Sequence, residues 1–217
     1  MWNEKHKYVS VFLQVYFPKN FEWAKGGKLP GLYSKFGQSG GNHEDPDGFS
    51  YRVMWRAGGQ AEAYVYAPGN QDLTIERIPG FFSDGSIGTS LGRGVQTFED
   101  NHWNTIKLYM KMNSVRGGKP VPDGVVKLMI NGKSAVDFDK MIWRTRPLVQ
   151  IEGIMFQVNT HPLNLGIFPF PSWYSGKRSY ESFILLNFCI YFCKYFRSIF
   201  ISFSNIQFFD LVLLWYL

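Results

Sequence analysis

Three things are scarce in this 217-residue sequence: cysteine, runs of basic residues, and helical periodicity. The two cysteines, Cys189 and Cys193, lie four residues apart in one apolar stretch, a spacing with no preferred geometry for a disulfide. No histidine lies beside them, which argues against a zinc site. The cysteines therefore assign neither a metal nor a redox compartment.

The charged residues are modest in number and evenly spread. The net charge is +6, and the basic residues do not gather in runs, which argues against a nucleic-acid-binding arm. A mildly basic chain suits an acidic partner, but charge alone does not choose among a polyuronate, a nucleic acid and a membrane surface. The N-terminus is charged and leads into an alternating segment, so we expect no signal peptide there.

Alternation of apolar and polar residues dominates the first part of the chain and predicts strands, with no long helix, up to about residue 156. The expected strands are 8–17, 49–56, 62–67, 95–98, 103–112, 124–130, 133–138 and 149–156. Glycine-rich segments predict a rigid loop at 26–31, a loop at 37–48 and a long loop at 68–92. The pattern predicts an all-β fold, an antiparallel β-sandwich of jelly-roll type with a concave substrate groove.

The composition changes after residue 157, so we divide the chain into a domain at 8–157 and an apolar tail at 158–217. The tail is crowded with aromatic residues but holds only two of the 22 glycines. Three interpretations stay open for it: a transmembrane helix near 183–203, a buried helical extension, and read-through of a retained intron. Lys194 and Arg197 would each cost about 3 kcal/mol at a bilayer centre, which disfavours the first.

One hairpin gathers polar side chains. Segments 49–56 and 62–67 are expected to pair through the short connection at 57–60. Alternation then places four polar side chains on one face: Ser50, Arg52, Tyr64 and Tyr66. The opposite face of the hairpin is apolar and is expected in the core. Lys28, from the preceding loop, is within reach of the polar face.

Cations and tyrosines without a carboxylate pair suit β-elimination from a uronate polymer. A base removes the proton from the carbon beside the carboxylate, and an acid protonates the leaving glycosidic oxygen. Arg or Lys stabilises the charge that builds in the enolate-like transition state, and a Tyr hydroxyl serves as acid or base. Hydrolysis would instead need two carboxylates, and this face offers Glu62 alone.

The same residue types also occur as ordinary decoration of a sheet, because Tyr and Arg stack well across strands. Lys107 and Lys111 either line a groove or belong to a solvated strand face. The histidines and tryptophans have plain structural interpretations as loop, strand-start, core or groove-wall residues: His43, His102, Trp55, Trp103 and Trp143. Spacing alone therefore leaves chemistry and structure both open.

Several motifs in combination resemble one known family. The block Trp23–Leu32 reads WAKGGKLPGL, Ser50–Arg56 reads SYRVMWR, and Glu62–Pro68 reads EAYVYAP. Shorter matches extend the similarity to about residue 156. Together these blocks resemble polysaccharide lyase family fourteen, the alginate and glucuronan lyases. That resemblance implies a jelly-roll fold, no obligatory metal or cofactor, and cleavage of an acidic polysaccharide such as alginate or glucuronan.

The family's groove residues fall on the residues that alternation selects. The resemblance implies that Tyr64 or Tyr66 is the acid and base. It implies that Lys28 and Arg52 hold the uronate, with Ser50 beside them. Further residues expected to bind substrate along the groove are Gln14, Arg56, Lys107 and Lys111.

Departures from the family keep two alternatives open: a non-catalytic carbohydrate-binding jelly roll, and an inactive truncated lyase homologue. The resemblance implies a secreted, extracellular protein, whereas no signal peptide is expected, and the domain is expected to be incomplete at both ends. We expect a monomer that binds an acidic polysaccharide and no nucleic acid, with membrane contact only through the tail.

Overall fold

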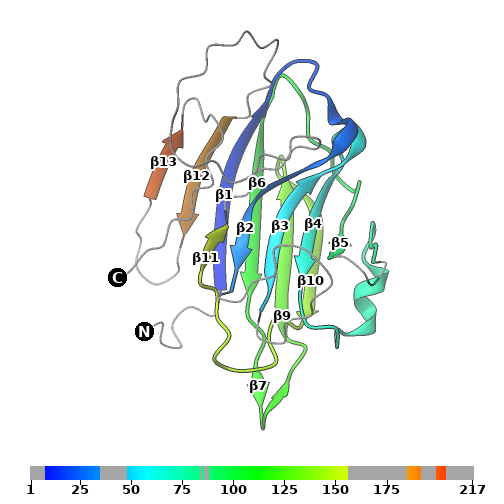
Figure 1. Ribbon diagram of the computed structural model, residues 1–217, viewed down its shortest axis with the longest axis vertical. Coiled ribbons are helices and arrows are strands. Elements are labelled where there is room, and N and C mark those ends of the chain that lie inside the picture. The colour runs from blue at the N-terminus through cyan, green and yellow to red at the C-terminus, as the bar shows by residue number, and fades with distance from the viewer. Residues whose placement is uncertain are drawn as a thin grey trace, which may run out of the picture.

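The computed structural model describes residues 8–34, 48–83, 85 and 88–155, together with the backbone of two tail segments, 185–191 and 199–203. Every strand pair is antiparallel, and the strands form two facing sheets and a small two-stranded ribbon (Figure 1). The all-β sandwich predicted from the sequence is confirmed. The predicted loop at 37–48 and His43 lie almost wholly outside the described residues.

The six-stranded sheet has the order β10-β9-β6-β1-β12-β13, and the five-stranded sheet has the order β11-β2-β3-β4-β5. Strands of the six-stranded sheet are β1 (Tyr8–Phe17), β6 (His102–Lys111), β9 (Gly124–Ile130), β10 (Lys133–Met141), β12 (Leu185–Tyr191) and β13 (Ile199–Phe203). Strands of the five-stranded sheet are β2 (Gly27–Tyr33), β3 (Ser50–Trp55), β4 (Ala61–Tyr66), β5 (Thr89–Leu91) and β11 (Gly153–Met155). The ribbon is β7 (Val115–Arg116) with β8 (Lys119–Pro120).

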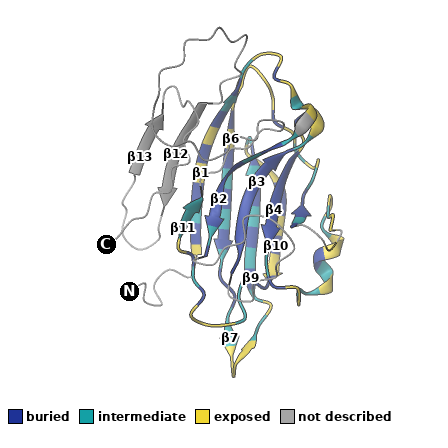
Figure 2. Cartoon of the chain, viewed as in Figure 1, coloured by how far each residue is buried: buried dark blue, intermediate teal, exposed yellow. Residues whose placement is uncertain are grey.

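The core lies between the sheets and is built by alternation. Val11, Leu13 and Val15 of β1 are buried, while the residues between them are half-buried or exposed. Each such aliphatic side chain contributes about 1.5–3 kcal/mol on burial. Trp55 and Trp143 are fully buried, as expected. Figure 2 shows the buried inner layer, with exposed residues gathered at the turns and on the outside.

The two sheets are joined by a hydrogen bond across the sandwich. Tyr51 of β3 is fully buried, and its hydroxyl donates to the carbonyl of Lys127 on β9 over 2.8 Å. The Tyr51 ring stacks on Trp143 with centroids 5.9 Å apart. Burial raises the pKa of this phenol well above its ordinary value. Tyr51 therefore stays neutral and serves the core rather than chemistry.

Residues 26–31 were expected as a loop and instead enter strand β2. The pairing of β2 with β3 is irregular between Lys28 and Gly31, a bulge that accommodates Pro30 without a ladder N–H. A Cβ on Gly31 would lie 2.6 Å from the Cα of Arg52, so only glycine permits this close approach. The glycines and the proline of residues 27–31, which indicated a loop, instead belong to a bulged strand.

Two further expectations were wrong in extent. Residues 95–98 form no strand, since only Thr97 bridges to Gln60, and glycines at positive φ turn the chain just before. The last strand, expected at 149–156, is confined to β11. The segment 68–92 holds a short 3₁₀ turn at Leu73–Arg77, capped where Asp72 accepts from the backbone N–H of Thr74 over 2.9 Å.

The tail contributes two strands where it is described. β12 pairs with β1, and β13 pairs with β12 (Figure 1). The helices considered for 183–203 are therefore replaced by extended chain in the described parts of that window. In the ranges that the structure describes, no helix is long and apolar enough to cross a bilayer.

Candidate active site

The register between β3 and β4 confirms the polar face predicted from alternation. Ser50 lies opposite Tyr66, and Arg52 lies opposite Tyr64. The intervening pair, Tyr51 and Val65, points into the core. The outward side of the five-stranded sheet, here called the site face, therefore carries all four side chains that the hairpin was expected to present.

Lys28 reaches the site face from β2 rather than from a loop. It lies opposite Met54 in the register. Its half-buried ammonium has a pKa below the ordinary value of 10.5, first because of burial and then because the guanidinium groups of Arg52 and Arg56 repel it. The structure thus brings Lys28 together with Ser50, Arg52, Tyr64 and Tyr66. It also adds Tyr33, which lies opposite Ser50.

The hydroxyl groups of Tyr64 and Tyr66, both on β4, form a hydrogen bond with each other. Their hydroxyl oxygens are 3.2 Å apart, and their rings meet edge to face with centroids 5.4 Å apart. The backbone N–H of Gly88 donates to the hydroxyl of Tyr64 over 3.0 Å. Burial, followed by the contact with Tyr66, raises the pKa of Tyr64. Tyr64 therefore holds its proton at neutral pH and is suited to donate it.

The rings of this tyrosine pair occupy the space where a side chain at position 88 would lie, so glycine is required there. A Cβ there would lie 2.8 Å from Cε2 of Tyr66 and 2.9 Å from Cζ of Tyr64. Both rings therefore pack on the glycine backbone, which also supplies the N–H to Tyr64. The sequence pattern gave no sign of this role, because Gly88 lies 24 residues from Tyr64 in a segment expected as loop.

Arg52 is the most deeply placed cation of the site. Its side chain is fully buried, and its guanidinium carbon lies 5.9 Å from the ring centroid of Tyr66. Burial lowers its pKa, while the neighbouring tyrosines act in the opposite direction. An arginine stays charged even so, and a buried cation strengthens any interaction with an anion that reaches it.

Glu62 anchors two arginines beside the tyrosines. Its carboxylate is fully buried and accepts from Arg56 Nη2 on one oxygen and from Arg93 Nε on the other, both at 2.6 Å. Arg93 also donates to the Ser90 hydroxyl over 2.6 Å. Arg56, expected to bind substrate, lies with its guanidinium 5.5 Å from the Tyr64 ring. The sequence did not predict that Arg93 binds Glu62, because the two residues are far apart in the chain and come together only when it folds.

Three expected groove residues lie elsewhere. Gln14 is on β1, and Lys107 and Lys111 are on β6, all pointing outward from the six-stranded sheet. They therefore lie on a different face of the molecule from the other five residues, and their role in substrate binding stays a prediction. Alternation predicts which residues of a strand share a side, but it does not tell which sheet the strand joins. His102 is exposed at the start of β6, as expected.

The structure is thus an antiparallel β-sandwich with cations and a pair of tyrosines on one sheet face, and comparison with known proteins shows which family has this fold. The profile of the family Polysaccharide lyase 14 matches residues 2–159. The chain belongs to this family, as its motifs predicted.

Solved structures and a curated protein are similar to the chain. The marine alginate lyase of Aplysia kurodai is 29% identical with a TM-score of 0.59, over 71% of this chain and 60% of that one. An alginate lyase from Chlorella virus is 26% identical with a TM-score of 0.60, over 73% and 64%. Exolysin of Paramecium bursaria Chlorella virus 1 is 26% identical over 65% of this chain and 24% of that protein. The chain spans less than two thirds of each.

Gly88→Ala tests the packing of the tyrosine pair. The added methyl group should push both rings aside, because their far ends can move while the backbone cannot. We expect turnover to fall about tenfold or more, with the free energy of unfolding changed by no more than about 1 kcal/mol. Gly85→Ala is a control for stability, because a Cβ at Gly85 strains a backbone at φ 75° but meets no atom within 4 Å, so it does not touch the tyrosines. Equal turnover of both variants would contradict the assigned role.

Glu62→Gln tests the buried ion pairs. The amide leaves Arg56 and Arg93 without their shared negative partner, so we expect a loss of about 3 kcal/mol in the free energy of unfolding, measured with urea. Asp137→Asn is the control, because its ion pair with Lys127 is exposed and should be worth less than about 1 kcal/mol. Similar losses in the two variants would refute a special role for Glu62.

Proposed function

We propose that the chain is a lyase that cleaves a uronate polymer, such as alginate or glucuronan, by β-elimination. The observation that carries the proposal is the bonded pair of Tyr64 and Tyr66 hydroxyls on the same sheet face as Lys28 and Arg52. Family membership supports it, as do the similar proteins described as alginate lyases.

The cations supply the first requirement of the reaction. A proton beside a carboxylate is hard to remove while the carboxylate keeps its full charge. Lys28 and Arg52 neutralise that charge when they hold the uronate carboxylate, and they stabilise the additional charge of the enolate-like transition state. The pKa of Lys28 is lowered by burial and then by repulsion from its cationic neighbours, and a bound anion relieves that repulsion.

The tyrosine pair supplies the proton transfers. Tyr64 keeps its proton, so Tyr66 is assigned as the base. Tyr66 takes up the proton from the carbon beside the carboxylate, the electron pair of that bond forms the new carbon–carbon double bond, and the departing glycosidic oxygen takes up the proton that Tyr66 then carries. Tyr64 donates its hydroxyl hydrogen to the Tyr66 oxygen across the 3.2 Å contact and stabilises that oxygen while it acts as the base.

Hydrolysis of the same polymer is the poorer fit to this face. It needs an acid and a base carboxyl group on opposite sides of the scissile bond. Among the described residues of β2, β3 and β4, Glu62 is the acidic residue on the site face, and its two oxygens are bound to arginines. A non-catalytic binding protein would gain nothing from a bonded tyrosine pair. The extracellular location and the monomeric state stay predictions.

The elimination itself is the first test. Purified chain is mixed with polymannuronate, polyguluronate and glucuronan, and the ultraviolet absorbance of the new conjugated double bond is followed. We expect activity on at least one polymer, and a loss of about 10²–10⁴-fold in Tyr66→Phe. Tyr16→Phe is the matched control, since that hydroxyl bonds to exposed Asn101 on the other sheet. Absence of unsaturated product from every polymer would overturn the proposal.

The pH profile tests the role of Lys28. Because its pKa is lowered in the free protein, kcat/KM should fall on the alkaline side below pH 10.5, as Lys28 loses its charge. A bound uronate favours the charged ammonium of Lys28. The alkaline fall in kcat, the alkaline limb of the profile, should therefore lie at higher pH than the fall in kcat/KM. Lys28→Arg should remove this limb, because a guanidinium does not titrate there. An unchanged limb in that variant would assign it to another group.

A further inference from the structure

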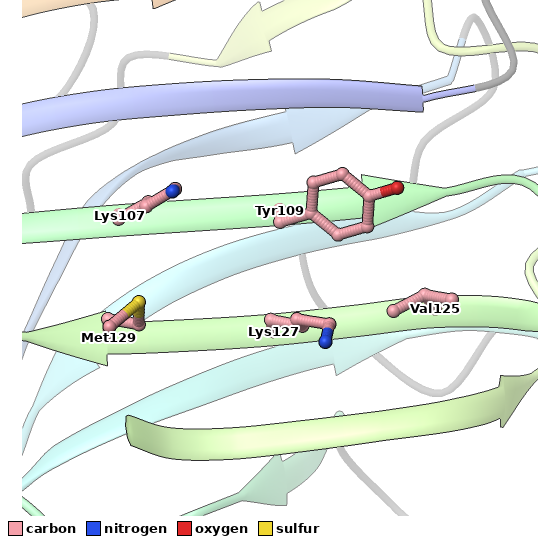
Figure 3. Close-up of a pocket in the computed structure, with 5 residues that line it drawn as sticks. All are labelled: Lys107, Tyr109, Val125, Lys127 and Met129. Carbon is pink, nitrogen blue, oxygen red and sulfur yellow. The ribbon is translucent and has the colours of Figure 1, made fainter. Parts of the chain in front are cut away.

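The outward side of the six-stranded sheet, here called the back face, carries a second group of lysines and aromatic residues. Lys107 and Tyr109 of β6 lie with Val125, Lys127 and Met129 of β9 around a hollow of about 440 Å³ (Figure 3). Lys111 continues the row on β6, two positions beyond Tyr109. None of these residues belongs to the site face.

The register shows how the back face is ordered. Tyr109 lies opposite Lys127, and Lys107 lies opposite Met129. Along β6 the outward side chains therefore alternate lysine, tyrosine, lysine, with an apolar edge supplied by β9. A sugar ring has apolar C–H faces that pack on aromatic rings, and its carboxylate pairs with ammonium groups. The back face offers both in one strand.

The charge of this face is positive along β6 and is partly compensated at its edges. The outward positions of β1, β6 and β9 hold three lysines and no carboxylate. Lys127 is neutralised from the neighbouring strand, where Asp137 lies 2.9 Å from its ammonium. Lys107 and Lys111 remain as cations, and the Lys107 ammonium lies 5.1 Å from the ring centroid of Phe12. The face is therefore complementary to an extended anion.

We propose that the back face is a second, non-catalytic binding surface for an acidic polysaccharide, formed by Lys107, Tyr109 and Lys111. The identity of that polysaccharide as a uronate polymer rests on the proposed function. The site face and the back face lie on opposite sides of the sandwich, so the surface holds a different stretch of chain from the one being cleaved. Two attachment points raise the effective concentration of a long polymer at the site.

A nucleic acid is the less suitable occupant of this surface. Binding of a phosphate backbone draws on many cations, and its affinity falls steeply with salt. The back face provides two lysines on one strand, Lys107 and Lys111, and Lys111 also interacts electrostatically with the carboxylate of Asp123. That number suits a polymer of sugars carrying one carboxylate each, with part of the affinity coming from the tyrosine ring.

The test measures polymer binding in a Tyr66→Phe background, so that cleavage does not interfere. Isothermal titration with a uronate polymer compares three proteins: this background, the background with Lys107→Gln and Lys111→Gln, and the background with Lys19→Gln and Lys119→Gln. The last variant removes the same charge at exposed sites outside the six-stranded sheet. Glutamine keeps most of the side-chain length, and unfolding midpoints verify that all three proteins fold.

We expect the Lys107/Lys111 variant to raise the Kd for the polymer about fivefold and the control variant to change it by less than about twofold. Equal Kd values in all three proteins, or an equal loss of affinity in both lysine variants, would contradict the proposed binding surface. Binding of single-stranded DNA as tight as that of the uronate polymer would overturn the assigned occupant. If only the Lys107/Lys111 variant loses polymer binding, and the unsubstituted chain produces no unsaturated ends, the binding surface is supported and the proposed lyase activity is contradicted.

Discussion

The antiparallel register of β3 and β4 is the constraint on which the rest of the structure depends. It places Arg52 beside Tyr64 and Ser50 beside Tyr66 on the outward side, while Tyr51 faces the core. A slip of one residue would exchange the two faces of a strand, so that Arg52 would point into the apolar core and Tyr51 would leave it. The register is held from within by the Tyr51 hydroxyl, which bonds to the opposite sheet. Core packing and site geometry are thus two consequences of one pairing.

The electrostatics of the site follow from crowding cations around few anions. Burial and the nearby guanidinium groups of Arg52 and Arg56 lower the pKa of Lys28, and Glu62 offsets part of the positive charge by binding Arg56 and Arg93. The balance of charge around Lys28 is positive. An enzyme for uronates needs that imbalance, because the substrate carboxylate must be more stable bound in its enolate form than in its ground state.

Much of this site could be predicted from the sequence because its core lies on one hairpin. Alternation along 49–56 and 62–67 was sufficient to select Ser50, Arg52, Tyr64 and Tyr66, since neighbouring strands joined by a short turn must pair. The sequence did not predict contacts between residues that are far apart in the chain. Nothing local shows that Gly88 packs on the tyrosines or that Arg93 binds Glu62. Nor does alternation assign β6 to a sheet, so the sequence could not tell whether Lys107 lies on the same face as the tyrosines.

The division of strands between the sheets also separates the site from the tail. All five strands of the site-bearing sheet come from residues 27–155, within the region that matches the family profile. β12, in contrast, lies beyond that region and pairs with β1 of the other sheet. A strand with partners on both sides exposes no free edge, so the tail completes the back of the sandwich. The described strands of the tail pair within the sheet that does not carry the tyrosines, and the hydrogen bond from Tyr51 to Lys127 links that sheet to the other.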